Sequence, residues 1–117
     1  MSEPLDERYA VEDSALVRRV RPRRGTPYEH RCLKESYEQV AHTIDERGSE
    51  PFTLEDLQAK TRLPFTQVAV ALAFMKERGV VVVAHGRRSR AASESVHLDA
   101  MIEYWALAEH APGSGAP

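Results

Sequence analysis

The sequence predicts an α+β domain that is mainly helical, and two residue patterns carry this expectation. Apolar residues recur at helical spacing in three central segments and in one segment near the C-terminus. Between the third and the last of these segments stand four consecutive valines, residues 80–83, and a glycine follows shortly after them. Such a run is typical of a β-hairpin. The 117 residues suffice for one domain and are too few for two ordinary ones.

Residues 1–25 are expected to form a flexible basic arm and not a packed element. Acidic residues open this segment, apolar residues are sparse, and five of the seven residues 18–24 are basic: Arg18, Arg19, Arg21, Arg23 and Arg24. Like charges at this density repel one another unless an anion is nearby. The segment is therefore either a solvated tail or an arm that contacts DNA. Residues 111–117, rich in Pro, Gly and Ala, have the composition of a flexible tail.

The folded domain is expected over residues 26–110, and its first helix is expected to begin at a capping box. Thr26 can cap the helix, Pro27 fits its first position, and Glu29 stands three residues after the cap. Gly48 is expected to end it. The apolar stripe of this helix consists of Leu33, Tyr37, Val40, Ala41 and Ile44.

A second helix is expected over residues 54–61, because Thr53 can cap it and Asp56 stands three residues later, where its side chain can complete a capping box. Pro64 then breaks the chain and starts a third helix that runs to about Arg78. The second and third helices are thus joined by only a few residues.

The valine run predicts a hairpin with a first strand over residues 80–85, a turn at Gly86 and a second strand within residues 89–98. The start of the last helix stays open between Ser93 and Asp99, since either residue can cap it. The apolar residues of this helix stand at spacings of three, one and three: Leu98, Met101, Ile102 and Trp105.

Three helices followed by a two-stranded hairpin is the element order of a winged helix-turn-helix. Over about residues 28–93 the chain resembles the DNA-binding domain of bacterial winged-helix transcription regulators. The residues that carry this resemblance are 53–64, Val68, Ala71, Leu72 and 76–81. The resemblance implies a module that binds double-stranded DNA and regulates transcription.

The resemblance further implies a recognition helix whose N-terminal residues enter the major groove of DNA. Its base-facing positions would fall to Phe65, Thr66 and Gln67; Gln67 can pair with adenine, and Phe65 can touch a thymine methyl group. The hairpin would be the wing, with three arginines at or near its tip: Arg87, Arg88 and Arg90.

Two positions depart from the usual motif. A small residue commonly stands where this chain has Gln58, and glycine commonly stands where it has Arg62. A left-handed backbone at Arg62 costs on the order of 1 kcal/mol. A turn of different construction is therefore expected here.

The third helix is apolar all round. One side suffices for a core face, and the opposite side is also apolar, with Val70, Ala73 and Phe74. Such a helix is normally buried all round. Its outer face is thus expected to be covered by residues 15–17 of the arm, by a second copy of the chain or by a different protein.

Charge and composition exclude several classes of protein. Lys and Arg total 16 against 18 acids, a net charge of -2, so a nucleic acid can be met only by a local basic patch. The longest apolar run, residues 68–75, is far shorter than the roughly 20 residues of a membrane-spanning helix. The N-terminus lacks the pattern of a signal peptide. Because the single Cys32 cannot form an internal disulfide, a cytoplasmic location is expected.

No metal, cofactor or catalytic site is expected, and the chain is not expected to be an enzyme. On a helix, His30 and Cys32 would point to different faces, and His85 and His97 have no further ligand near them in the sequence. The chain has neither a glycine-rich phosphate loop nor a nucleophile elbow.

Two functions remain open. The preferred one is a DNA-binding transcription regulator that forms a homodimer, with Tyr104 and Trp105 of the last helix as interface residues; equally, Trp105 can simply close the core. The alternative is association with another protein through the apolar third helix, at Val70, Ala73 and Phe74. No membrane partner is expected.

Overall fold

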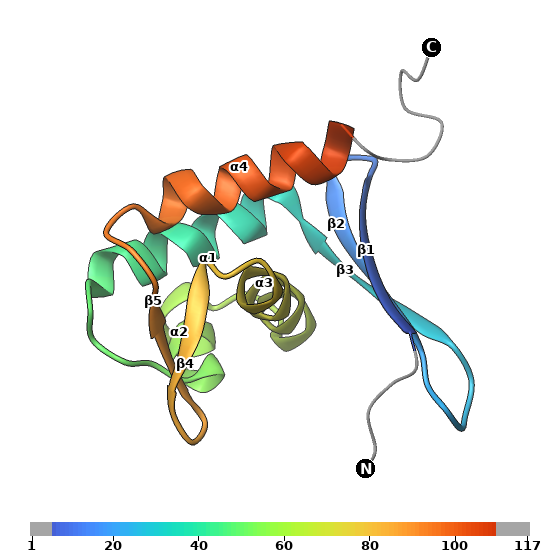
Figure 1. Ribbon diagram of the computed structural model, residues 1–117, viewed down its shortest axis with the longest axis horizontal. Helices are drawn as coiled ribbons and strands as arrows, with labels where there is room; N and C mark the ends of the chain where they lie inside the picture. The colour runs from blue at the N-terminus through green and yellow to red at the C-terminus, as the bar shows by residue number, and fades with distance from the viewer. Residues whose placement is uncertain (1–5, 110–117) are drawn as a thin grey trace.

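The computed structural model describes residues 6–109 and has an α+β fold (Figure 1). The elements of this part of the chain are, in order, β1 (Asp6–Glu12), β2 (Ala15–Arg21), β3 (Tyr28–Leu33), α1 (Lys34–Arg47), α2 (Leu54–Thr61), α3 (Phe65–Glu77), β4 (Val81–His85), β5 (Arg88–Ala91) and α4 (Val96–Glu109). The strands form two antiparallel sheets, β1–β2–β3 and β4–β5. The expected tail at residues 111–117 lies outside the described residues.

Residues 6–21 form two strands of a packed sheet, and this corrects the flexible arm expected over residues 1–25, of which residues 1–5 lie outside the described residues. Along β2 and β3, Leu16 and Cys32 pair across the strands and are fully buried, whereas Arg19 and Arg31, on the opposite face of the sheet, are exposed. Alternate residues of a strand point to opposite faces, so the arginines do not accumulate on one side. The connection between β1 and β2 has two positive-φ residues, as a type I′ hairpin turn requires: Asp13 (φ 53°) and Ser14 (φ 60°).

The first helix starts later than expected. Residues 28–33 belong to β3, and α1 begins at Lys34 after Leu33, which makes no side-chain cap. The capping box proposed for Thr26, Pro27 and Glu29 is therefore wrong. Pairing of β3 with β2 decides the conformation here, because a local capping signal contributes only about 1 kcal/mol. The end of α1 at Gly48 is confirmed.

The second helix matches its expected limits and its capping box. The N–H of Asp56 donates to Thr53 Oγ1 at 3.1 Å, and the N–H of Thr53 donates to Asp56 Oδ2 at 2.9 Å. After the helix, Arg62 adopts the left-handed conformation, with φ 62° and ψ 21°. The expectation of a differently built turn is thus wrong. The N–H of Arg62 donates to the carbonyl of Gln58 at 2.7 Å, which holds the turn in place.

Strand β5 begins one residue earlier than expected, and α4 begins at Val96, within the interval left open by the sequence. The backbone of Phe52 exchanges two hydrogen bonds with Ser89 and joins the β4–β5 hairpin through an isolated β-bridge. The Asp45 carboxylate accepts the backbone N–H groups of Val96 and His97, at 3.1 and 3.2 Å. These contacts attach the start of α4 to the end of α1.

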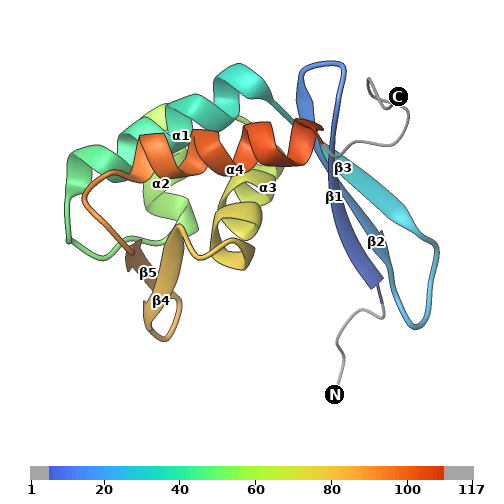
Figure 2. The same cartoon turned by 45° about the horizontal axis from the view of Figure 1, so that its top comes forward.

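Helix α3 lies at the centre of the molecule, between α1 and α2 on one side and the three-stranded sheet on the other (Figure 2). Its outer face is covered, as expected, and the cover is the N-terminal sheet of the same chain. Val70 and Phe74 are fully buried, and the Phe74 ring contacts those of Tyr9 at 5.1 Å and Tyr37 at 6.0 Å. Leu16, in the segment expected to supply the cover, belongs to the same buried cluster.

Among residues 6–109, no helix is long and apolar enough to cross a lipid bilayer.

Candidate nucleic-acid interface

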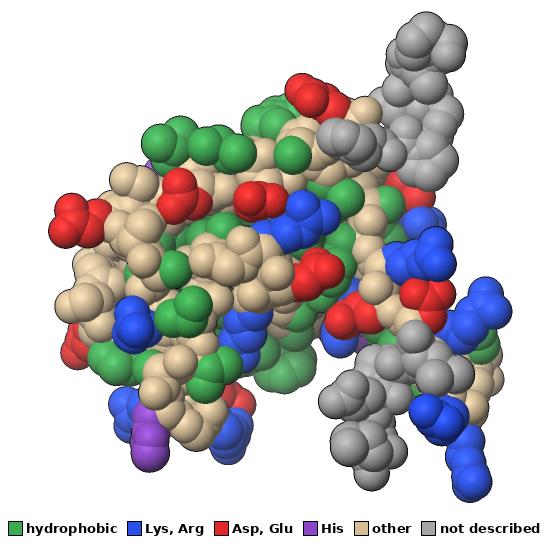
Figure 3. Space-filling model, viewed as in Figure 1, with side chains coloured by type: hydrophobic (Ala, Val, Ile, Leu, Met, Phe, Trp, Pro, Cys, Tyr) green, Lys and Arg blue, Asp and Glu red, His purple; other side chains and the backbone are tan. Residues whose placement is uncertain are grey.

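Two hairpins project from the molecule on the side opposite α4, and α3 lies between them (Figure 1). The β4–β5 hairpin carries Arg87, Arg88 and Arg90, and the connection from β2 to β3 carries Arg23 and Arg24, with Arg21 at the end of β2. All six side chains are exposed. In the space-filling view, blue side chains stand at both tips, and the outline of the molecule recedes between them (Figure 3). The structure therefore brings two basic groups, far apart in the sequence, to one side of the fold.

Five of these six arginines form no ion pair with any residue from 6 to 109. The sixth, Arg87, lies 3.1 Å from Glu55, but the two side chains are 83% and 58% exposed. An ion pair at such exposure contributes little and is screened by salt. Arg87 is therefore available to an external anion as well. Two acidic residues of α2 lie beside the β4–β5 hairpin, Glu55 next to Arg87 and Asp56, whose pKa the charge of Arg88 helps to lower.

The other two arginines of the basic run, Arg18 and Arg19, are held within the sheet. Arg18 is ion-paired with Glu7, and Arg19 makes a bidentate pair with Glu12 at 2.7 and 2.8 Å as well as a bond to Glu29 at 3.0 Å. The Arg19 hydrogen bond lowers the pKa of the Glu12 carboxyl from its ordinary value. These two arginines stabilise the sheet, and the basic side of the molecule depends on the remaining ones.

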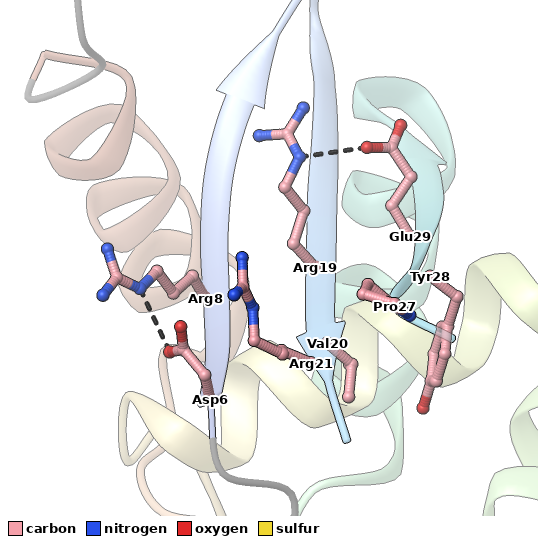
Figure 4. A pocket seen from close by; sticks show the side chains of 8 residues that line it. All are labelled: Asp6, Arg8, Arg19, Val20, Arg21, Pro27, Tyr28 and Glu29. Carbon is pink, nitrogen blue, oxygen red and sulfur yellow. Dashed lines mark hydrogen bonds and ion pairs between the residues drawn. The ribbon is translucent and has the colours of Figure 1, made fainter. Parts of the chain in front are cut away.

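Figure 4 shows paired and unpaired arginines side by side in an open trough on the sheet. Three arginines line it, but Arg8 is paired with Asp6 at 3.1 Å and Arg19 with Glu29 at 3.0 Å. Arg21 has no such partner among the described residues. The trough thus carries nearly balanced charge, and it lies on the face of the sheet that is turned away from α3, so Arg21 is not part of the surface beside α3.

At the start of α3, the structure separates the three side chains for which base contacts were expected. Phe65 is 52% exposed, and Thr66 is exposed as well. Gln67 instead turns toward the sheet, where its Oε1 accepts the backbone N–H of Leu33 at 3.0 Å. A bidentate contact to adenine needs both polar atoms of the amide. Gln67 therefore serves the junction of sheet and helix, and only Phe65 and Thr66 remain free at this end.

Sequence reasoning missed an aromatic pair beside this surface. The rings of Tyr28 and His30 lie 5.0 Å apart on β3, and both residues are exposed. Because they alternate with residues of the opposite face, they share the face of Cys32, which packs toward α3. The spacing of two residues between Tyr28, His30 and Cys32 could have indicated that they share one face of a strand. On the helix that was expected here, this spacing does not put them on one face. On a strand, the pair extends the candidate interface between α3 and the β2–β3 connection.

Of the two interface residues expected on the last helix, one is buried and the other is exposed. Tyr104 is 1% exposed and packs against the ring of Tyr37 at 5.6 Å, so it belongs to the core. Trp105 is 51% exposed. On α3, Val70 and Phe74 are core residues and cannot contact another chain, and Ala73 is only half-buried.

The described residues 6–109 contain no group of three or more His, Cys, Asp or Glu side chains that could hold a metal ion. On β3, His30 and Cys32 do share a face, which corrects their expected placement on different helix faces. Burial raises the pKa of the Cys32 thiol to about 12, so the thiolate that binds metals or attacks substrates is scarce at neutral pH. His97 stacks on His42 at 3.8 Å, and not on His85.

The geometry can therefore bind an extended anion: unpaired guanidinium groups stand on two hairpins, and an exposed aromatic pair and the tip of α3 lie between them. No protein-family model, curated protein or solved structure matches the chain.

Proposed function

We propose that the protein is a winged-helix module that binds double-stranded DNA and acts as a transcription regulator. The observation that carries the proposal is the projection of two arginine-bearing hairpins on one side of the fold, with α3 between them. Duplex DNA is a dense line of phosphates, and it attracts such a surface even when the net charge of the protein is negative.

The arrangement of elements supports a winged helix. Helices α1, α2 and α3 precede the β4–β5 hairpin, α2 and α3 are joined by residues 62–64, and an isolated bridge from Phe52 to Ser89 ties the segment before α2 to the hairpin. In this reading α3 is the recognition helix and the β4–β5 hairpin is the wing. The left-handed turn at Arg62 sets the angle between α2 and α3, as glycine does in the usual motif.

Most of the binding energy in this arrangement comes from phosphate contacts. The guanidinium groups of Arg87 and Arg88 on one hairpin, and of Arg23 and Arg24 on the other, contact the DNA backbone on either side of α3. Direct base contacts are limited to Phe65 and Thr66 at the start of α3, because the Gln67 side chain is already hydrogen-bonded to the backbone of Leu33. Phosphate contacts position a protein without reading sequence. The module is therefore expected to bind many duplexes with similar affinity.

Association with another protein through α3 is the weaker alternative. That idea depended on a bare apolar face, but Val70 and Phe74 are fully buried under the N-terminal sheet. A partner could reach this face only if the sheet left it.

The decisive experiment is a titration of a labelled mixed-sequence duplex, followed by fluorescence anisotropy at two salt concentrations. The logarithm of affinity is expected to fall with the logarithm of salt concentration by about 0.9 per phosphate contact. Substituting alanine for Arg87, Arg88 and Arg90 together should flatten the slope by up to about 2.7, because each of the three guanidinium groups can neutralise one phosphate.

The matched control is Lys60→Ala, which removes an exposed cation from α2, beside the acidic residues Glu35, Glu38 and Glu46 of α1. It should leave the salt slope unchanged. If the triple variant kept the wild-type slope, the β4–β5 hairpin would not be the DNA contact. Absence of duplex binding at low salt would remove the proposed function altogether.

A further inference from the structure

Helix α3 covers only one end of the sheet face on which it packs. At that end Leu16 and Cys32 pair across β2 and β3, and both belong to the buried cluster that contains α3. Further along the same face of β3, His30 is exposed and Tyr28 is 44% exposed. The sheet face is therefore open toward the β2–β3 connection, and β3 presents two aromatic rings there.

The two rings of this aromatic pair do not cover each other. Their centroids lie 5.0 Å apart, and their planes are tilted by 41°. The rings of His42 and His97, which do stack, lie 3.8 Å apart and only 12° from parallel. The exposed surface of Tyr28 and His30 is therefore available to a flat ligand. Nucleic-acid bases are such ligands, because each base has a π-face that stacks on aromatic side chains.

Positive charge stands close to the aromatic pair in the chain. Arg23 and Arg24 lie in the β2–β3 connection, five and four residues before Tyr28, and both are exposed without an ion pair to any residue from 6 to 109. Arg18, on the neighbouring strand, is already ion-paired with Glu7. The available charge therefore lies on the connection. Rings beside free guanidinium groups match a ligand that joins flat bases to phosphates, as a nucleic-acid strand does.

The pairing state of the bases decides which DNA can use these rings. In a duplex, the faces of the bases are stacked on their neighbours, and only the base edges are reached from the grooves. A face is free for stacking only on an unpaired base. The aromatic pair can therefore bind bases only where a strand is single, next to the duplex that α3 and the β4–β5 hairpin are proposed to contact.

We propose that Tyr28 and His30 stack on unpaired bases, and that the preferred ligand is a DNA duplex with an adjoining single-stranded segment. Arg23 and Arg24 contact the phosphates of that segment. The duplex half of this inference rests on the proposed function, whereas the stacking half rests on the geometry of the sheet alone. Because stacking uses the face of a base and not its edge, the single strand is bound with little regard to its sequence.

Fluorescence anisotropy with the full chain tests the ligand class on three labelled DNAs: a blunt duplex, a duplex with a short overhang and a single strand. The two duplexes carry the same number of phosphates, so that counterion release contributes about equally to both affinities. A stacked base changes affinity by about 5-fold to 150-fold. The wild-type chain should therefore bind the overhang duplex at least about 5-fold more tightly than the blunt one.

Two double variants separate the rings from their polar atoms. Tyr28→Ala with His30→Ala removes both rings, and the two duplexes should then bind with equal affinity. Tyr28→Phe with His30→Phe keeps both rings and should keep the preference for the overhang. The matched control is Trp105→Ala, which removes a 51% exposed ring from α4, on the side of the molecule opposite the two hairpins (Figure 1). It should also keep the preference.

Stacking is observed directly with 2-aminopurine in the overhang, because the fluorescence of this base is quenched when it stacks on an aromatic ring. The wild-type chain and the phenylalanine variant should quench it, and the alanine variant should not. Circular dichroism melting checks that each variant folds.

The outcomes separate this inference from the proposed function. A preference that is lost in the alanine variant and kept in the phenylalanine variant supports both halves. Equal binding of the two duplexes by the wild type, or a preference that survives in the alanine variant or is lost in the phenylalanine variant, overturns stacking by these rings and leaves the proposed function standing. Binding of the single strand without the blunt duplex overturns the proposed function and leaves stacking standing. Absence of binding to all three DNAs overturns both.

Discussion

Phe74 is the residue through which the N-terminal sheet and the helical part of the molecule depend on each other. Its ring is fully buried, contacts the rings of Tyr9 on β1 and Tyr37 on α1, and has the guanidinium carbon of Arg78 5.0 Å from its centre. Phe74→Ala removes these contacts and leaves a cavity between the sheet and α3. We therefore expect a large loss of stability from this one substitution.

The magnitude follows from the contacts. Burial of a Phe side chain contributes about 1.5 to 3 kcal/mol, and a well-placed aromatic pair adds about 0.5 to 1.5 kcal/mol. With the cavity left behind, Phe74→Ala should lower the free energy of unfolding by about 3 to 5 kcal/mol. A domain of this size is stable by roughly 5 to 15 kcal/mol in total. With an unfolding entropy of about 2.1 cal/mol/K per residue, the substitution is expected to lower the melting temperature by about 12 to 20 °C.

Urea denaturation followed by circular dichroism measures the loss, and Phe65→Ala is the control on the same helix. Because Phe65 is 52% exposed, its removal should change stability by no more than about 0.5 kcal/mol. A double-mutant cycle with Tyr9→Ala tests the sheet as the cover of α3, and a coupling of at least about 0.5 kcal/mol is expected. Equal effects of Phe74→Ala and Phe65→Ala, or zero coupling to Tyr9, would refute the packing of the sheet on α3.

Four further outcomes are expected. Thr53→Ala should cost about 1 kcal/mol at pH 7, because it removes the cap of α2. The backbone hydrogen bond from Thr53 lowers the pKa of Asp56, so the stability that this carboxylate contributes is present above its unfolded pKa of about 3.9 and is lost as pH falls through its folded value; urea midpoints at pH 7 and in acid check the sign. Gln67→Leu should cost about 1 kcal/mol and speed hydrogen exchange at the Leu33 amide, whereas Gln67→Glu, which keeps an acceptor, should protect it. Iodoacetamide at pH 8 should leave Cys32 unlabelled in the folded protein and label it in urea, because the side chain is buried and its pKa is raised to about 12; rapid labelling of the folded chain would contradict the burial.

The elements that local chemistry determines could be predicted from the sequence. The capping box of Thr53 and Asp56, the break at Pro64 and the valine run each act within a few residues, and α2, α3 and β4 lie where these signals put them. Fold class could be predicted for the same reason.

The N-terminal sheet was missed because its stability comes from distant partners. Its turn signal, Asp13-Ser14, is not one of the strongest dipeptides for a hairpin, and the buried Leu16 and Cys32 gain their energy only against α3. Because residues 15–21 were not expected to form a strand, the basic run was interpreted as one group. On a strand, the arginines of such a run point alternately to two opposite faces. Arg19 is held by acids on neighbouring strands, and no local pattern shows such pairing.

The packing of the sheet on α3 has a consequence for the order in which the chain is made. Strands β1, β2 and β3 leave the ribosome before α3 and are joined by short connections, so they can pair early. Their cover, α3, is synthesised more than 30 residues later. At ribosomal rates of about 5 to 20 residues per second, the apolar face around Leu16 waits seconds for its partner. During that interval the sheet is open to other apolar chains, and a slower ribosome or a weakened α3 should appear first as aggregation of nascent protein.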